Sequence, residues 1–208
     1  PVRFMSNYSS GKMGYAIAVA AKAKGASVEL ISGPVALNPI TDISTTYVET
    51  SSEMYESVKE KVSNFDIFIS TAAIADYKPA SYSDIKYKKN ENNITIEFTR
   101  GVDILETISK KYKNLFTVGF AAETNSLKEN AQQKLAKKNL DIIVGNIANH
   151  ELKLGFESDY NEVTILSNTN SKKISYDKKS NIANKILDFI AIEYSNKLQL
   201  VKSNAKKS

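Results

Sequence analysis

The stretch Asp66–Ser70, Asp-Ile-Phe-Ile-Ser, decides the fold class of this chain. A short run that is apolar at consecutive positions is typical of a strand in a parallel sheet, because helices cover both of its faces. Leu115–Phe120 and Asp141–Val144 are strands of the same kind, and helical patterns separate them. This alternation predicts an α/β fold: a doubly wound, mostly parallel, Rossmann-like sheet with helices on both faces.

The other elements follow from periodicity and from turn residues. We expect helices at Lys12–Lys24, Ser52 to about Val62, Asp103–Tyr112, Ser126–Lys138 and Ser180–Tyr194, and strands at Ser27–Ile31, Thr45–Glu49 and Ile94–Phe98. Ser51 or Ser52 is expected to cap the second helix. Glu162–Leu166 and Lys173–Tyr176 predict a late antiparallel strand pair.

Composition limits the chemistry of the chain. Its 208 residues contain no cysteine and one histidine, which excludes a disulfide framework, a thiolate nucleophile and a His/Cys metal cluster. The formal charge of +5 suits phosphate-rich small molecules, whereas scattered lysines do not indicate nucleic acid. No run is long enough for a membrane span, and we expect a cytoplasmic location. We expect one domain over residues 1–198 and a frayed basic tail over 199–208.

The stretch Ser6–Gly14, Ser-Asn-Tyr-Ser-Ser-Gly-Lys-Met-Gly, is a polar loop that opens a helix of small residues. The N-terminus of a helix favours an anion, and Lys12 adds a positive charge. The stretch does not match the phosphate-binding P-loop, because Met13 stands where that motif has Ser or Thr. Phosphate binding and an ordinary loop cap are both open from these residues alone.

Polar residues at strand ends are further candidates, since ligands bind beyond the carboxyl ends of parallel strands. Asp76 follows the Asp66–Ser70 strand, where it either meets a ligand or caps a packed turn. The charge run Asp84–Glu91 is either solvated surface or a flap that carries Lys86. Asp103 either caps a helix or lies in a turn whose N–H groups read a base edge.

Lys134 and Lys138 lie four residues apart and so share one helix face. They either reach the same anion or simply face solvent. His150 is most simply an incidental polar residue of a loop.

Six motifs in order along the chain carry a resemblance to a known family. They are Arg3–Gly14 (RFMSNYSSGKMG), Ala72–Tyr77 (AAIADY), Lys86–Lys89 (KYKK), Val118–Thr124 (VGFAAET), Lys134–Asp141 (KLAKKNLD) and Gly155–Asn161 (GFESDYN). Their ordered combination resembles bacterial phosphopantothenoylcysteine synthetase, the coenzyme A pathway ligase that is often fused behind a flavin-dependent decarboxylase.

The resemblance implies a two-step ligation. CTP, with Mg²⁺, activates the carboxylate of 4′-phosphopantothenate as an acyl-cytidylate and releases pyrophosphate; L-cysteine then displaces CMP. It also implies a homodimer, a fused or separate decarboxylase partner, and no FMN in this chain. The alternatives are an NAD(P)- or flavin-dependent oxidoreductase on a similar sheet and a non-catalytic nucleotide-binding module.

The resemblance also implies roles for particular residues. It assigns catalysis to Asn7 and Lys86. It assigns CTP contacts to Asp76, Lys86, Gly101, Val102, Asp103, Ile104, Phe120, Lys134 and Lys138, and acyl-substrate contacts to Arg3, Asn7, Ser10, Gly11, Ala72 and Ala73. It identifies no metal ligands.

The chain departs from the family pattern in two places. Gly101-Val102 stands where relatives commonly have Asn-Pro, which puts cytosine selectivity in question. Relatives also carry an additional strand and a Gly-rich turn before the position of Pro1. We expect a chain without that strand to be less stable and less active than an N-terminally extended one, and equal melting and activity would contradict this.

Overall fold

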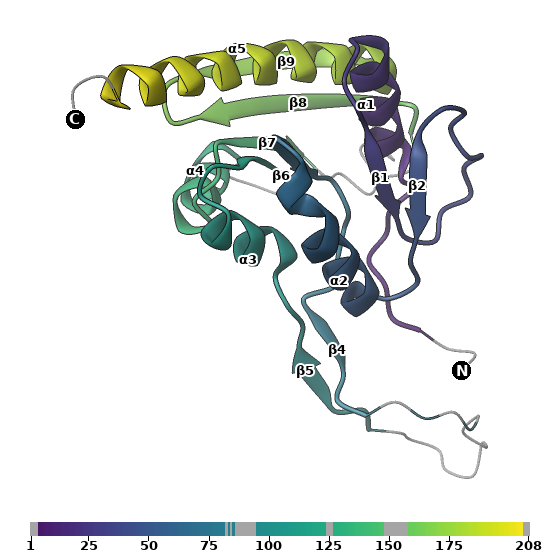
Figure 1. Cartoon of the computed structure of the whole chain (residues 1–208). Helices are drawn as coiled ribbons and strands as arrows, with labels where there is room; N and C mark the ends of the chain where they lie inside the picture. Colours follow the sequence, from purple (N-terminus) through teal and green to yellow (C-terminus); the bar gives the residue numbers. More distant parts are fainter. Residues whose placement is uncertain are drawn as a thin grey trace.

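The central sheet has five strands in the order β3-β6-β7-β8-β9. In this computed structural model, the described residues are 4–81, 83, 85, 95–123, 127–147 and 158–205. The strands of the sheet are β3 (Ile67–Ser70), β6 (Phe116–Glu123), β7 (Ile142–Ile147), β8 (Tyr160–Ser167) and β9 (Ser171–Lys178). The helices are α1 (Lys12–Ala23), α2 (Ser51–Lys61), α3 (Ile104–Lys111), α4 (Leu127–Lys137) and α5 (Lys179–Ala205), and a short 3₁₀ turn spans Val62–Asn64 (Figure 1).

The pairing of the strands confirms the predicted α/β class. β3, β6 and β7 run parallel, with Ile67 opposite Phe116 and Val118 opposite Ile142. β8 is antiparallel to both β7 and β9, which confirms the late antiparallel pair. The sheet is therefore mostly parallel where the proposed ligand edge lies and antiparallel at its far side.

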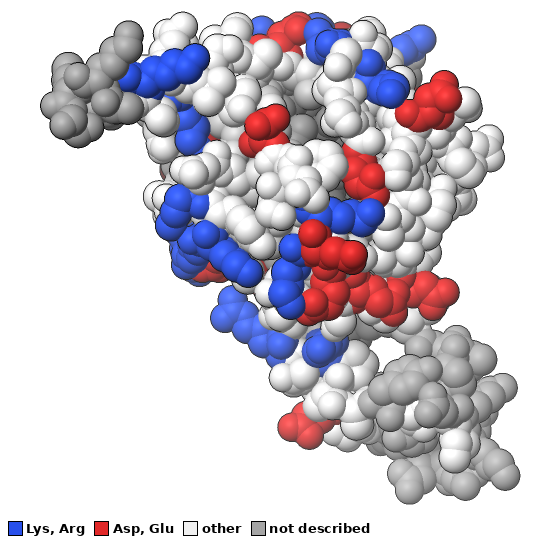
Figure 2. All heavy atoms as spheres, in the orientation of Figure 1, with Lys and Arg blue, Asp and Glu red and all other residues white. Residues whose placement is uncertain are grey.

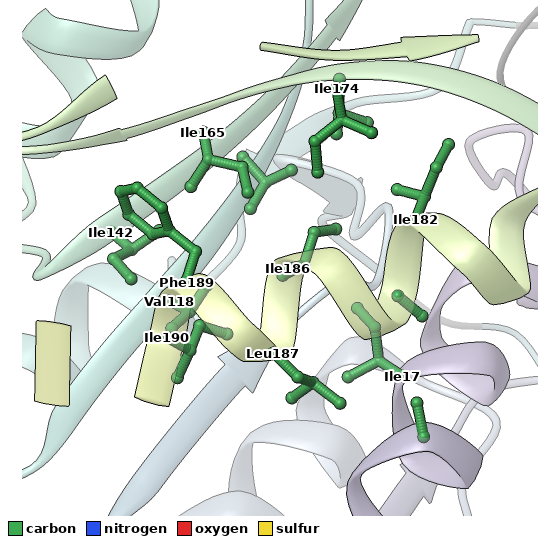
Figure 3. Packing of buried hydrophobic residues seen from close by; sticks show 14 of the residues in the cluster. Ile17, Val118, Ile142, Ile165, Ile174, Ile182, Ile186, Leu187, Phe189 and Ile190 are labelled. Carbon is green, nitrogen blue, oxygen red and sulfur yellow. The ribbon is translucent and has the colours of Figure 1, made fainter. Parts of the chain in front are cut away.

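Helices cover both faces of this sheet. α1 and α5 share one face, where Ile17, Val118 and Ile142 belong to the same buried cluster as α5 residues such as Ile186 (Figure 3). On the other face, Ile143 packs with α4 residues, and Ile108 of α3 packs with residues of α2. Apolar residues point both ways from β6 and β7, as the continuous apolar runs predict.

The first helix is held close to the sheet by its small residues. Gly11, with a φ of 73°, precedes α1, and Gly25, with a φ of 87°, follows it. At Gly14 a Cβ atom would lie 2.7 Å from Thr71 Oγ1, so a larger residue there would force the Thr71 side chain or α1 to shift.

Several elements differ from the prediction. β1 (Glu29–Ser32) and β2 (Ser44–Tyr47) form a parallel pair of their own rather than joining the central sheet. Among the described strands, none pairs with the second edge of β1 or of β3. A separate antiparallel pair, β4 (Tyr77–Pro79) and β5 (Phe98–Arg100), projects from the body of the chain (Figure 1).

Helix boundaries also differ. The side chain of Thr50, not that of Ser51 or Ser52, caps α2 by accepting from the Glu53 N–H. α5 continues to Ala205, so the described part of the expected tail is helical. The reason is local: Tyr194 to Ala205 contains neither glycine nor proline to end the helix. No helix in the described ranges is long and apolar enough to cross a membrane.

Candidate functional site

The N-terminal loop lies against the segment that follows β3. The Asn7 side-chain amide donates a hydrogen bond to the carbonyl oxygen of Ile74 at 3.1 Å. Asn7 is exposed, as are Ala72 and Asp76 of the same segment, whereas Ala73 is half-buried. The structure therefore brings Asn7 of the N-terminal loop and the segment Ala72–Asp76 together at the carboxyl end of β3.

The turn Gly101–Ile104 lies beside the same segment. The Gly101 N–H donates to the Asp76 carbonyl oxygen at 2.8 Å. β4 and β5 reinforce the contact, since Tyr77 pairs with Arg100 immediately before the turn. A Cβ atom at Gly101 would lie 3.5 Å from that oxygen, an ordinary contact, so the position does not depend on glycine for space.

Asp103 has two tasks in this turn, one for each carboxylate oxygen. Its Oδ1 accepts from the Glu106 N–H at 2.9 Å and caps α3, which confirms the simpler of its two predicted roles. Its Oδ2 lies 2.7 Å from Lys138 Nζ. Burial raises the pKa of Asp103, but the hydrogen bonds from Lys138 and from the Glu106 N–H outweigh it and leave the pKa below its usual value.

The two lysines at the end of α4 do not lie in open solvent. Both are half-buried; Lys134 belongs to α4, and the Lys138 N–H continues the helix by donating to the Lys134 carbonyl. The Ser109 hydroxyl donates to the Lys138 carbonyl and so ties this helix end to α3. Lys138 is therefore held over the turn Gly101–Ile104, with its charge directed at Asp103.

Phe120 lies on the other side of the sheet from these lysines. It is partly buried and packs against the cluster formed by α1 and α5. Lys138 instead lies on the face that carries α3 and α4. The candidate residues surround the strand ends from both faces.

Sequence reasoning missed a small cavity beside the turn. It measures about 210 Å³ and is lined by residues of α2, β4 and the turn: Ser51, Ser52, Tyr55, Glu56, Lys78, Gly101 and Val102. Lys78 donates to the Ser52 hydroxyl at 3.3 Å across its wall. No sequence pattern predicted this cavity, because the β4 strand that forms part of its wall is short and lies within the polar segment after Asp76.

Arg3 and Lys86, the latter with nearly all of the predicted flap, lie outside the described residues. Their roles remain predictions.

Charged side chains of both signs lie around the candidate site. Figure 2 shows basic side chains gathered over α3 and α4 and acidic ones beside them over α2. Lysines can neutralise phosphates and a neutral amide can orient them, and neither has to act as a nucleophile. In the described ranges, no group of three or more His, Asp or Glu side chains could hold a metal ion by itself.

An α/β sheet with its polar residues at the strand ends defines the class of small-ligand-binding doubly wound proteins. Comparison with known sequences identifies the family. The profile of the DNA/pantothenate metabolism flavoprotein C-terminal domain matches residues 1–194, and the chain belongs to this family.

Curated relatives carry the name coenzyme A biosynthesis bifunctional protein CoaBC. The Vibrio vulnificus (strain CMCP6) protein is 42% identical over 190 residues, covering 90% of this chain and 47% of the relative. The Bacillus subtilis (strain 168) protein is 44% identical over 174 residues, covering 83% and 43%. The chain thus spans about half the length of the curated relatives it matches.

Solved structures agree with this family. The crystal structure of the C-terminal domain of CoaBC superposes with a TM-score of 0.79 at 38% identity, covering 94% of this chain and 89% of that one. A Cab2 mutant in complex with phosphopantothenate-cysteine superposes with a TM-score of 0.77 at 16% identity, covering 97% and 83%, and shows the shared fold.

Proposed function

We propose that this chain is the ligase that joins 4′-phosphopantothenate to L-cysteine at the expense of CTP. The observation that carries the proposal is the position of the Asn7 amide, which donates to the Ile74 carbonyl at 3.1 Å and so lies at the end of β3 beside Asp76. The relatives are named as bifunctional proteins of coenzyme A biosynthesis, which supports a role in that pathway. The phosphopantothenate-cysteine held by the Cab2 mutant supports phosphopantothenate and cysteine as the substrates.

The proposed reaction has two steps. An oxygen of the phosphopantothenate carboxylate attacks the α-phosphorus of CTP, and the bond to pyrophosphate breaks. The cysteine amine then attacks the acyl carbon, an amide bond forms, CMP leaves and a proton is lost from the nitrogen. Neither step needs a covalent bond to the protein, which suits a chain without cysteine.

The protein's part is to position and neutralise. Asn7 orients the acyl oxygen as a neutral donor, and the Ser10–Gly11 end of the loop holds the acyl substrate with Ala72 and Ala73. The turn Gly101–Ile104 takes the base through its backbone. Asp76, Phe120, Lys134 and Lys138 contact CTP, as does Lys86 of the flap.

Mg²⁺ enters this proposal with the nucleotide. Mg²⁺ usually keeps phosphate oxygens and waters as ligands and takes one or two carboxylates from a protein. The exposed carboxylate of Asp76, next to the turn that takes the base, fits one such ligand. The metal would supply charge neutralisation at the triphosphate.

One assay tests the function against its alternatives. The chain is supplied with CTP, Mg²⁺, phosphopantothenate and cysteine, and pyrophosphate and CMP are followed separately. Pyrophosphate that requires phosphopantothenate, and CMP that requires cysteine as well, is the expected result. CTP binding without either product would favour the nucleotide-binding module, and NADPH binding without product would favour the oxidoreductase.

Asn7→Asp tests the residue that carries the proposal. A carboxylate lacks the amide donor and repels the acyl-phosphate, so CMP release should fall more than pyrophosphate release. Asn184→Asp is the matched control, because the Asn184 amide also donates to a backbone carbonyl, that of Ser180, but on α5. Equal rates of cysteine-dependent CMP release in Asn7→Asp and in the control would show that Asn7 has no role in the reaction.

We further propose a homodimer, a cytoplasmic location and a decarboxylase partner, fused or separate. The bifunctional names of the relatives support a decarboxylase partner. Sedimentation of the purified chain tests the dimer: a mass of one chain at assay concentration would reject it.

A further inference from the structure

The turn Gly101–Ile104 forms one wall of the small cavity of about 210 Å³, through Gly101 and Val102. Lys78 of β4 and the first turns of α2 form the other walls. We call this space the turn cavity. The α2 residues that line it have a spacing that places them on one face of the helix: Ser51, Ser52, Tyr55 and Glu56. None of the lining residues from α2 and β4 is assigned a role in the two proposed reaction steps.

The walls of the turn cavity are held in place by the core beneath them. Tyr55 packs against a buried cluster that contains Val58 of α2 and Ile104 of α3. The hydrogen bond from the Gly101 N–H to the Asp76 carbonyl oxygen, at 2.8 Å, fixes the turn against the segment that leads into β4. The turn cavity is therefore a preformed feature of the fold.

The volume of the turn cavity suits a single base rather than a whole nucleotide. Sites for complete small molecules measure roughly 300–1,000 Å³, and the turn cavity is smaller, at about 210 Å³. Ser52, Glu56, Lys78 and Val102 are exposed, so the cavity is open to solvent. A base can enter it while the ribose and the phosphates stay outside.

One carboxylate and one ammonium group line the turn cavity, and both can bind a ligand. Glu56 Oε2 accepts from Lys59 Nζ at 2.8 Å, and in the described part of the chain Glu56 Oε1 has no hydrogen-bond partner. Lys78 Nζ donates to the Ser52 hydroxyl at 3.3 Å, and an ammonium group has further protons to donate. Among the described residues, no ion pair joins Lys78 to Glu56.

We propose that the turn cavity takes the base of the nucleotide and that Glu56 and Lys78 make it selective for cytosine; the inference rests on the proposed use of CTP. Cytosine carries an amino group on one side of a ring nitrogen and a carbonyl group on the other. The Glu56 carboxylate accepts from the amino group, and Lys78 donates to the carbonyl oxygen. Tyr55 and Val102 provide apolar surface for the ring.

The same two side chains disfavour other bases. Uracil has a carbonyl group where cytosine has its amino group, so two acceptors would face each other at Glu56. Adenine has the amino group but lacks a carbonyl group for Lys78. Selectivity then comes from α2 and β4, which the departure of Gly101-Val102 from the family pattern does not alter.

Nucleotide binding without turnover tests the inference. CTP, UTP and ATP are titrated separately into the chain by calorimetry, with Mg²⁺ and without phosphopantothenate, and the parent should bind CTP most tightly. Glu56→Gln should weaken CTP binding roughly tenfold and should not weaken UTP binding, because the amide loses the charged acceptor and can donate to the uracil carbonyl. Lys78→Met should weaken CTP and UTP binding by a similar factor, again roughly tenfold, and should leave ATP binding unchanged.

Two control variants separate the carboxylate from its surroundings. Lys59→Gln removes the ion pair with Glu56 but leaves the carboxylate in the turn cavity, so its preference for CTP over UTP should equal that of the parent. Glu60→Gln, at an exposed position one turn further along α2 and outside the cavity lining, should also bind as the parent does. Glu56, Lys59 and Lys78 are exposed, and an unchanged Tm checks that each variant folds.

The outcomes separate this inference from the ligase function. The inference is overturned, and the ligase function stands, if the parent releases pyrophosphate while Glu56→Gln keeps the CTP preference or Lys78→Met keeps the CTP affinity. If the parent releases no pyrophosphate but both variants show the expected shifts, the turn cavity remains the base pocket of a nucleotide-binding module. Binding of L-cysteine alone that both variants abolish, with unchanged nucleotide affinities, would overturn the inference in favour of an amino-acid site.

Discussion

The two oxygens of Asp103 allow its two contacts to be separated by mutation. Oδ1 caps α3 through the Glu106 N–H, and Oδ2 accepts from Lys138. Asparagine caps a helix about as well as aspartate does, so Asp103→Asn keeps the first contact and turns an amide donor toward the lysine. Asp103→Ala removes both contacts.

The structure sets the size of each effect. The side chains of Asp103 and Lys138 are each 24% exposed, so their ion pair is partly screened and contributes about 0.5–1.5 kcal/mol. Loss of the cap adds about 1 kcal/mol. Asp103→Asn should therefore lower the free energy of unfolding by about 0.5–1.5 kcal/mol and Asp103→Ala by about 1.5–2.5 kcal/mol, and each 1 kcal/mol corresponds to roughly 2–4 °C in Tm for a domain of this size.

Urea unfolding of a double-mutant cycle measures the pair. Asp103→Asn and Lys138→Gln, alone and together, should show a coupling of about 0.5–1 kcal/mol. Lys137→Gln is the matched control, because Lys137 is the exposed neighbour and should change stability by less than about 0.5 kcal/mol. A coupling of zero, or equal losses for Asp103→Asn and Asp103→Ala, would refute the division of labour between the two oxygens.

The sign of the pH dependence provides a second check. The pKa of Asp103 is lowered in the folded chain, so its ionised form stabilises the fold at pH values above the unfolded pKa of about 3.9. This stabilisation is lost as pH falls through the folded pKa. The gap in stability between the parent and Asp103→Asn should be full at pH 7 and should close in strong acid; a gap that widens there would contradict the assignment.

Three other predictions concern the core, the start of α5 and the flap. Gly119→Ala should cost about 1–3 kcal/mol in urea unfolding, because the new Cβ would lie 2.7 Å from Leu105 Cδ2, and Leu105→Ala should recover part of the loss when combined with it. NMR titration should find the Asp177 pKa at about 2, and Lys185→Met should raise it. An Asp177 pKa that is the same in Lys185→Met and in the parent would show that the ion pair does not form in solution. Lys86→Gln should mainly slow pyrophosphate release, and a normal rate would place Lys86 outside the site.

The sequence predicted the parts of the fold that depend on local patterns. The apolar runs of β3, β6 and β7 identify strands covered on both faces, and Asp103 identifies the start of α3. It did not predict β4, because Tyr77–Pro79 is too short for a pattern and becomes a strand only by pairing with Phe98–Arg100. The separation of β1 and β2 from the central sheet had the same cause: a pattern identifies a strand but not its partner.

In the candidate site too, local sequence predicted individual residues but not the contacts between distant segments. Strand-end position and the family resemblance predicted its residues, and the contacts of Asn7 with Ile74 and of Gly101 with Asp76 bring three of its segments together. The ion pair between Asp103 and Lys138 was not predicted, because it depends on how α3 and α4 pack and not on either local sequence. The spacing of Lys134 and Lys138 indicated a shared face but not which charge that face meets.

That ion pair also links stability to the proposed nucleotide site. In the structure Lys138 is held by Asp103, at the turn that we propose takes the base. A triphosphate carries more negative charge than one carboxylate, so it can attract the Lys138 ammonium group away from Asp103. The protein then loses part of the stabilisation that the Asp103–Lys138 pair supplies. The cost falls on CTP affinity, because the α3 cap through Oδ1 remains in place while Oδ2 loses its partner. Under the proposed function, part of the stabilisation from the Asp103–Lys138 pair is therefore subtracted from CTP affinity when the ammonium group moves to the triphosphate.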